Sequence, residues 1–106
     1  MNPRTQARAV HGPAGDLQCA IDEPEGKPVL GTAVVCHPHP QFGGTMDNKV
    51  VQTLARSFVQ LGWRAVRFNF RGVGQSAGHW DGGVGEIDDA SAVLQAFDQA
   101  DQPLAL

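Results

Sequence analysis

Residues 31–70 decide the fold, and they read GTAVVCHPHPQFGGTMDNKVVQTLARSFVQLGWRAVRFNF. A short apolar run rich in β-branched residues, 32–36, is typical of a strand that is covered on both faces. The loop that follows, residues 37–44, contains two prolines and two glycines, which exclude regular structure. Apolar residues then recur at helical spacing as far as Gly62, and residues 63–70 favour a second buried strand. The stretch therefore predicts a unit of strand, loop, helix and strand.

The predicted helix begins after Thr45, which is expected to cap its first turn. Its apolar residues are Val50, Val51, Leu54, Ala55, Phe58 and Leu61. Toward the amino end of the chain, residues 16–22 alternate between apolar and polar side chains, which indicates a half-exposed strand. Toward the carboxyl end, residues 72–85 contain six glycines and are expected to be a loop. Helical spacing returns from Glu86, and residues 103–106, PLAL, read as the start of another strand.

The order of these elements indicates an α/β fold with a mainly parallel sheet, because strand, helix and strand in succession form right-handed crossover units. Because the crossover helices pack against the faces of such a sheet, we expect a three-layer sandwich with helices on both faces. In such sheets ligands bind beyond the carboxyl ends of the strands. The loops 37–44 and 71–85 are therefore where a functional site is expected.

Charge is distributed unevenly along the chain. The five ionisable residues from Lys49 to Arg71 are all basic, whereas beyond Arg71 there are six acidic residues and no Lys or Arg. This separation indicates that Arg67 or Arg71 meets a carboxylate in the fold. The candidates are Asp81, Glu86, Asp88 and Asp89. The alternative is that the basic and the acidic residues form separate solvated surfaces.

Residues 1–106 are expected to form one domain at most, or the amino-terminal part of one, because this length supports a single modest core. Hydrophobic residues make up 42% and charged residues 18% of the chain, a balance that excludes a disordered protein. The net charge of −3 argues against nucleic acid as a partner. Apolar runs are too short to span a membrane and no leader sequence is recognised, so we expect a cytoplasmic protein. Cys19 and Cys36 match no metal or redox spacing and are expected to be buried, reduced thiols.

Two segments resemble a bacterial family of predicted α/β-hydrolases, which are small single-domain proteins. They are VVCHPHPQFGGTMDNKVVQTLA (34–55) and GWRAVRFNFRGVGQSAGHWDGGVGEIDDA (62–90). The family's motifs are HPHP…GGTM.NKV and RFNFRGVG.S.G, and the match runs from about Gly12 to the carboxyl end. The resemblance implies an α/β-hydrolase fold with strand order 1-2-4-3-5. It also implies a serine hydrolase acting on a small-molecule carboxylic ester, without cofactor or metal.

The resemblance implies a nucleophile, an acid and a histidine in that chain order, with the nucleophile on a sharp turn directly after the fifth strand. This chain reaches Leu106 inside that strand. The whole triad is therefore expected beyond residue 106, and this chain alone is expected to be inactive. His39 is the candidate for a backbone amide of the oxyanion hole, since it lies two places after His37, where related hydrolases place that donor.

Ser76 lies in GQSAG, residues 74–78, which fits the G-x-S-x-G pattern of a catalytic serine. That pattern is meaningful only where a strand leads straight into it and a helix straight out, because the strained turn exposes the hydroxyl. Here the predicted strand ends near Phe70 and loop continues to Gly85, so we interpret Ser76 as a decoy. The family also has this serine in the loop after its fourth strand. Gly72, Gly74 and Ala77 fit a dinucleotide fingerprint, but no helix begins within it.

Two alternatives stay open at the level of sequence. One is that the chain is a non-catalytic fragment or module that binds nothing specifically. The other is a histidine-based metallohydrolase, in which His37 and His39 would meet His79 and Asp81 from the neighbouring loop. We favour structural roles for these histidines, because short motifs are weak evidence alone. Substrate identity, acyl-chain preference and oligomeric state are not encoded in any pattern of this sequence.

Overall fold

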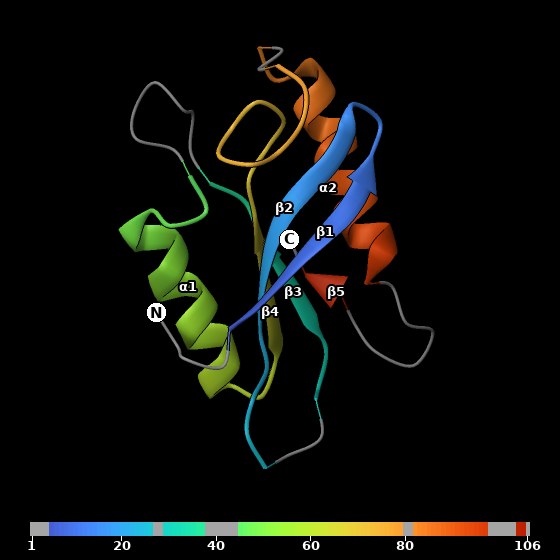
Figure 1. The fold of residues 1–106 in the computed structure, drawn as a ribbon. Coiled ribbons are helices and arrows are strands. Elements are labelled where there is room, and N and C mark those ends of the chain that lie inside the picture. The colour runs from blue at the N-terminus through green and yellow to red at the C-terminus, as the bar shows by residue number, and fades with distance from the viewer. Residues whose placement is uncertain (1–4, 27–28, 38–44, 80–81, 98–103, 106) are drawn as a thin grey trace.

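The computed structural model describes residues 5–26, 29–37, 45–79, 82–97 and 104–105 (Figure 1). Within these residues, five strands and two helices follow one another. They are β1 (Gln6–Gly12), β2 (Gly15–Asp22), β3 (Thr32–Val35), α1 (Lys49–Gln60), β4 (Arg64–Phe68), α2 (Val84–Ala96) and β5 (Leu104–Ala105). The strands form one sheet in the order β1-β2-β4-β3-β5, which confirms the predicted strand order.

The sheet is parallel where residues 31–70 predict it to be. β3 pairs with β4 in parallel, with Val34 opposite Val66, and β5 pairs in parallel with the other side of β3. β1 and β2 add two antiparallel pairs, one between themselves and one between β2 and β4. All four residues of β3 are buried, as expected for a strand in the middle of the sheet. The carboxyl ends of β3 and β4 therefore lie at the same edge.

β1 is an edge strand that the sequence did not reveal. Only Val10 and Gly12 are buried along its length, so it lacks the alternation by which a half-buried strand is recognised. A tight turn joins it to β2, and Gly15 in that turn has φ of 123°, a conformation that side chains rarely adopt. β1 could not be predicted from alternation of apolar and polar residues because most of its side chains are exposed.

The two helices cover opposite faces of the sheet, which gives the predicted three layers (Figure 1). The main core lies between the sheet and α2. Its buried residues are Val10, Leu17, Cys19, Ile21, Val34, Val66, Phe68, Phe70, Val93 and Phe97. Because side chains alternate along a strand, Ala65, Arg67 and Asn69 face the opposite layer, where α1 packs with its buried Val51 and Ala55.

α1 begins three residues later than a cap at Thr45 would place it. Asn48 is the cap, and its side-chain oxygen accepts a hydrogen bond from the amide of Val50 at 2.9 Å. Thr45 instead forms a turn, in which its hydroxyl accepts from the amide of Asp47 at 3.1 Å. The prediction of Thr45 as cap was therefore wrong, because a polar turn separates it from the helix.

α2 begins at Val84, two residues before the predicted start at Glu86. Gly83 precedes it with φ of 99°, and the Glu86 carboxylate accepts a hydrogen bond from the Gly83 amide at 2.7 Å. This contact satisfies a backbone donor that a helix start leaves unpaired. The predicted loop 72–85 is accordingly shorter. Among the described residues, no helix is both long and apolar enough to cross a membrane.

Candidate functional site

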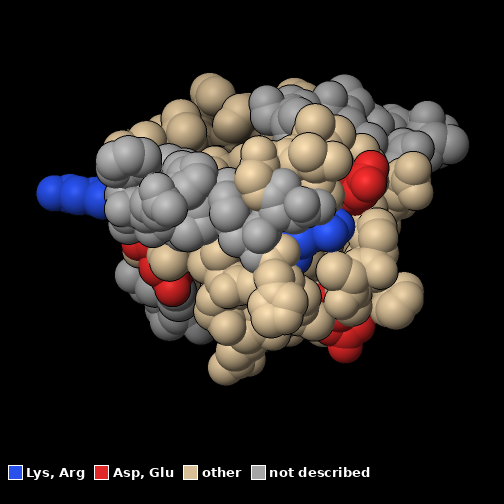
Figure 2. All heavy atoms as spheres, turned by 90° about the horizontal axis from the view of Figure 1, so that it is seen from above, with Lys and Arg blue, Asp and Glu red and all other residues tan. Residues whose placement is uncertain are grey.

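The segments that follow β3 and β4 meet at one end of the molecule, beyond the carboxyl ends of these parallel strands. Figure 2 looks down on this end, and most of the described atoms visible there belong to uncharged residues. This is the edge at which the sequence predicts a site. Four side chains connect the segments at this edge by hydrogen bonds: His37, Asn69, Ser76 and Arg71.

His37 joins the end of β3 to the segment after β4. Its ring is buried, and Nε2 accepts a hydrogen bond from the amide of Phe70 at 3.0 Å. The ring also meets Phe70 edge to face, with 4.9 Å between ring centroids. Because a neutral imidazole has one donor and one acceptor nitrogen, this bond places the ring proton on Nδ1. Nε2 is thereby committed to the backbone.

Asn69 connects three segments of the chain through four hydrogen bonds. Its side-chain oxygen accepts from the amide of Met46 at 2.8 Å, and its side-chain nitrogen donates to Oε1 of Gln18 at 2.8 Å. Its backbone amide donates to the Gln18 carbonyl at 2.9 Å, and its carbonyl accepts from the Ser76 hydroxyl at 2.6 Å. Asn69 thus links β2, the segment just before α1 and the glycine-rich loop between β4 and α2.

Ser76 is buried within this network. Its hydroxyl donates to the Asn69 carbonyl and accepts from the amide of Gln18 at 2.8 Å. β4 ends at Phe68 and α2 begins only at Val84, so neither element adjoins the serine as the turn of a catalytic serine requires. The hydroxyl holds the loop against β2. That Ser76 is not the nucleophile stays a prediction.

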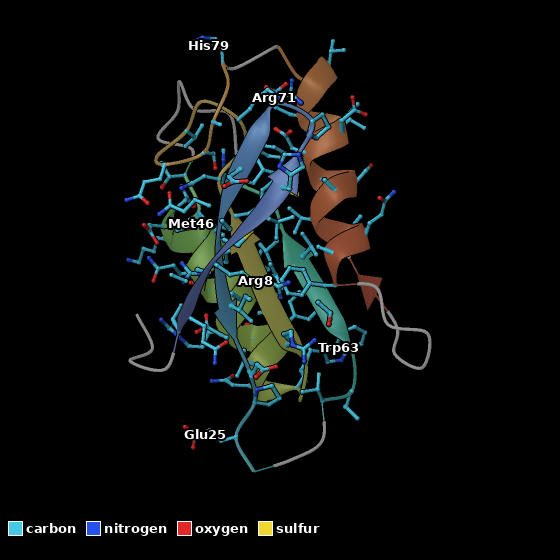
Figure 3. The ribbon with its side chains drawn as sticks, turned by 45° about the vertical axis from the view of Figure 1, so that its right-hand side comes forward. Arg8, Glu25, Met46, Trp63, Arg71 and His79 are labelled. Atoms are coloured by element: carbon cyan, nitrogen blue, oxygen red, sulfur yellow. The ribbon has the colours of Figure 1, made fainter. Side chains whose placement is uncertain are left out.

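Arg71 fastens the glycine-rich loop to α2. Its guanidinium meets the fully buried Asp89 carboxylate through Nη2 to Oδ1 at 2.9 Å and Nε to Oδ2 at 3.1 Å. Nη2 also donates to the Gly85 carbonyl at 2.8 Å. Figure 3 shows Arg71 at the amino-terminal end of α2. The predicted pairing of Arg67 or Arg71 with a later carboxylate is therefore confirmed, at Arg71 and Asp89.

Arg67 reaches the opposite layer and is only 2% exposed. Its Nη1 donates to the Met46 carbonyl at 3.0 Å and to the Asp47 carboxylate at 3.1 Å. Its Nη2 lies 3.8 Å from the carboxylate of Asp22. A buried guanidinium is stable only when its charge is balanced in this way. Its Nε is buried and has no hydrogen-bond partner among the described residues.

Of the predicted site residues on the two loops, two lie outside the part of the chain that the structure describes and one is exposed. His39, the candidate for the oxyanion hole, and Asp81 both lie outside the described residues. His79 is exposed on the loop after β4, at the top of Figure 3. No group of three metal-ligating side chains gathers among the residues that the structure describes.

Asn69 and Gln18 were not predicted as site residues. A signal for Asn69 was present, since an amide stands between Phe68 and Phe70 at the end of an apolar strand. A buried amide there requires partners. Its partners lie 51 and 23 residues away along the chain, so no local pattern could name them.

The two thiols take no part in the network. Burial raises the pKa of Cys19 and of Cys36 to about 11 in each case, because a thiolate is poorly solvated in apolar surroundings. Both cysteines are free, as expected, with Cys19 buried and Cys36 half-buried. Neither is a nucleophile near neutral pH.

Comparison with known proteins identifies relatives of considerably greater length. No protein-family model matches the chain. An uncharacterized protein of Rickettsia prowazekii is 42% identical over 89 residues, which are 84% of this chain and 37% of that protein. An α/β serine hydrolase homologue from Coxiella burnetii is 45% identical, with a TM-score of 0.86 over 93% of this chain and 49% of the other.

A serine hydrolase without a lid from Xanthomonas campestris is also 45% identical, with a TM-score of 0.85 over 98% of this chain and 50% of that one. A Pyrococcus furiosus esterase shares only 16% identity at a TM-score of 0.70, so its likeness extends to the fold alone. The chain spans about half the length of the hydrolases from Coxiella and Xanthomonas. It has the α/β-hydrolase fold over its described residues and belongs to the α/β-hydrolase superfamily.

Proposed function

We propose that this chain is the amino-terminal part of a serine hydrolase that acts on small-molecule carboxylic esters without a cofactor. The observation that carries the proposal is 45% identity to two α/β serine hydrolase structures along nearly the whole chain. The ester class follows from the resemblance of the motifs in residues 34–55 and 62–90, and esterases are among the proteins that share the fold at lower identity.

We place the nucleophile, the acid and the catalytic histidine outside residues 1–106. Two observations support this placement. The Ser76 hydroxyl is buried with its donor and acceptor functions both used by backbone groups. The matched hydrolases are about twice as long as this chain, which leaves room for the three residues. In the chain order of this superfamily, the nucleophile comes after the fifth strand and the acid and the histidine come later.

In this proposal the chain supplies the scaffold and one donor of the oxyanion hole. Attack of a serine on the ester carbonyl creates a tetrahedral intermediate whose oxygen bears a negative charge. The backbone amide of His39, beyond the carboxyl end of β3, is the proposed donor to that oxygen. One such donor stabilises the transition state by about 3 kcal/mol. Because the donor is a backbone amide, replacing the His39 side chain should affect turnover far less than losing the nucleophile.

The test joins this chain to the carboxyl-terminal half of the Xanthomonas hydrolase, in the register of the structural match. We expect the joined protein to hydrolyse p-nitrophenyl esters and to react with a fluorophosphonate probe. The 106-residue chain alone should do neither. Ser76→Ala in the joined protein should keep the probe reaction, since the labelled serine would come from the added half.

Two results would overturn the proposal. One is a joined protein with native circular dichroism that neither turns over a panel of esters nor reacts with the probe. The other is ester turnover by the 106-residue chain that Ser76→Ala abolishes, because the nucleophile would then be Ser76. Circular dichroism of each variant separates these results from a failure to fold.

A further inference from the structure

Two buried side chains hold a single residue at the start of the segment that leads into α1. The amide of Met46 donates to the side-chain oxygen of Asn69 at 2.8 Å. The carbonyl of the same residue accepts from Nη1 of Arg67 at 3.0 Å. Figure 3 shows Met46 on the side of the sheet that α1 covers. Both backbone polar groups of Met46 are thus bound by side chains from one short stretch of chain.

The spacing of these two side chains explains how they reach one residue. Residues 67 and 69 lie two apart at the end of an extended segment, so their side chains leave the same face of the sheet. Asn69 is 4% and Arg67 is 2% exposed. Polar groups buried this deeply destabilise the fold unless their partners are held in place. Any displacement of Met46 would break two buried hydrogen bonds.

Further contacts hold the two side chains. Asp22 and Asp47 face the Arg67 guanidinium, and Gln18 binds the Asn69 side-chain nitrogen. Gly74 packs against this amide pair with φ of 54°. A Cβ at Gly74 would lie 2.6 Å from Nδ2 of Asn69 and 2.7 Å from Oε1 of Gln18. The side-chain amide of Asn69 is therefore bound by Met46 and Gln18 and packed against Gly74.

The same stretch also holds the chain at the other end of the segment 38–44. His37 precedes that segment and accepts a hydrogen bond from the amide of Phe70. Met46 follows it and is bound by Asn69 and Arg67. The residues from 67 to 70 thus fix the chain on both sides of the segment to which His39 belongs.

We propose that Asn69, together with Arg67, is a positioning residue of the hydrolase. The two side chains fix the backbone of Met46, just before α1 begins, and we expect a shift of this backbone to weaken the oxyanion donor that the proposed function assigns to His39. The inference rests on the proposed function, because it assigns catalytic value to this placement. Neither side chain touches the substrate in this proposal, and both act through Met46.

The kinetic test uses Asn69→Leu and Asn69→Asp in the joined protein. Leucine has the branching and the number of side-chain heavy atoms of asparagine but cannot accept from Met46. Aspartate keeps an acceptor for the Met46 amide but loses the donor to Oε1 of Gln18. A displacement of about 1 Å lowers turnover on the order of 100-fold. We expect Asn69→Leu to lower kcat by roughly this factor with KM within about twofold, and Asn69→Asp to regain part of the loss.

The matched control is Thr53→Ala, which removes an exposed side-chain hydrogen bond within α1, from Thr53 to the Lys49 carbonyl. It should leave kcat and KM unchanged. If Asn69→Leu does not fold, Asn69→Ser replaces it, because the shorter side chain cannot reach the Met46 amide. A folded Asn69→Leu or Asn69→Ser protein with the kcat of the parent protein would overturn the inference.

Amide hydrogen exchange of the 106-residue chain provides a reading that is independent of catalysis. Asn69→Leu should speed exchange at Met46 while the amides of Val51 and Ala55, in the buried face of α1, keep their protection. An unchanged exchange rate at the Met46 amide would contradict the inference even where the joined protein is active. Conversely, a joined parent protein without turnover would count against the proposed function, and the exchange result would still report on the Met46 contacts.

Discussion

Single polar atoms decide the structure at the candidate site. The side-chain oxygen and nitrogen of Asn69, the hydroxyl of Ser76 and the Nε2 of His37 each bind a backbone or amide group of another segment. Buried donors and acceptors are costly to leave unpaired, so each of these atoms fixes its partner. The carboxyl edge of the sheet is thereby ordered by side chains where regular backbone pairing has ended.

Ser76→Ala tests the structural role of the serine hydroxyl. The variant leaves the buried Gln18 amide without its acceptor and the Asn69 carbonyl without a donor. We expect the free energy of unfolding to fall by about 1–3 kcal/mol, measured by urea denaturation of the 106-residue chain. The control is Ser57→Ala, which loses an exposed bond to the Thr53 carbonyl and should change stability by less than about 0.5 kcal/mol. Equal effects of the two variants would contradict the prediction.

The two thiols predict a dependence of stability on alkaline pH. In the folded chain the pKa of each of Cys19 and Cys36 is about 11, against an ordinary value of 9.0. Between these values the unfolded chain has lost thiol protons that the folded chain keeps, so the free energy of unfolding falls as pH rises from about 9 to about 11. Urea denaturation at pH 8, 9.5 and 10.5 measures this trend.

A Cys19→Ala, Cys36→Ala double variant is the control for this trend. It should show a shallower decline over the same pH range, because it has no thiol to ionise in the unfolded chain. A decline of the same slope in parent and variant would show that other groups are responsible.

At the scale of elements, the sequence revealed those parts whose signal is local. β3 and β4 could be predicted from apolar runs, and α1 from helical spacing, because burial imposes these patterns on neighbouring residues. β1 could not, since most of its side chains are exposed. The hydrogen bond between Gln18 and Ser76 joins residues 58 positions apart, and only the folded sheet brings them together.

α2 offers a test in which tertiary contact opposes helix propensity. Gly85→Ala would ordinarily stabilise a helix, by up to about 1 kcal/mol. Here a Cβ at Gly85 would overlap the guanidinium of Arg71, which is held by Asp89 and cannot move without breaking that pair. We expect a net loss of stability in thermal unfolding. Ser91→Ala, at an exposed position of the same helix, should have no effect or raise the melting temperature slightly.

A Gly85→Ala variant that is more stable than the parent chain would refute this reasoning. The guanidinium would then have an alternative position that the structure does not record. Loss of the pair can be checked directly with Asp89→Asn. In that background Gly85→Ala should cost less, because the Asp89 carboxylate no longer holds the Arg71 guanidinium above Gly85.

At the scale of the whole molecule, α1 carries an apolar stripe that the described residues do not cover. Val50, Leu54 and Leu61 lie at helical spacing and are 65%, 46% and 68% exposed. Exposed stripes of this kind are typical of surfaces that bind other protein. The matched hydrolases extend over about twice the length of this chain, and in the proposed protein the added half would cover the stripe.

The 106-residue chain should therefore associate with itself in a concentration-dependent way, as measured by light scattering during gel filtration. Val50→Lys with Leu54→Lys should reduce this association, because charges on the stripe oppose its burial, while the buried face of Val51 and Ala55 keeps α1 folded. The matched control places lysine at Gln60 and Gln52, on the polar surface of the same helix, and should leave association unchanged. A parent chain that stays monomeric up to millimolar concentration would contradict this prediction. It would show that the exposed apolar stripe on α1 is stable in water and does not require burial by a further part of the protein.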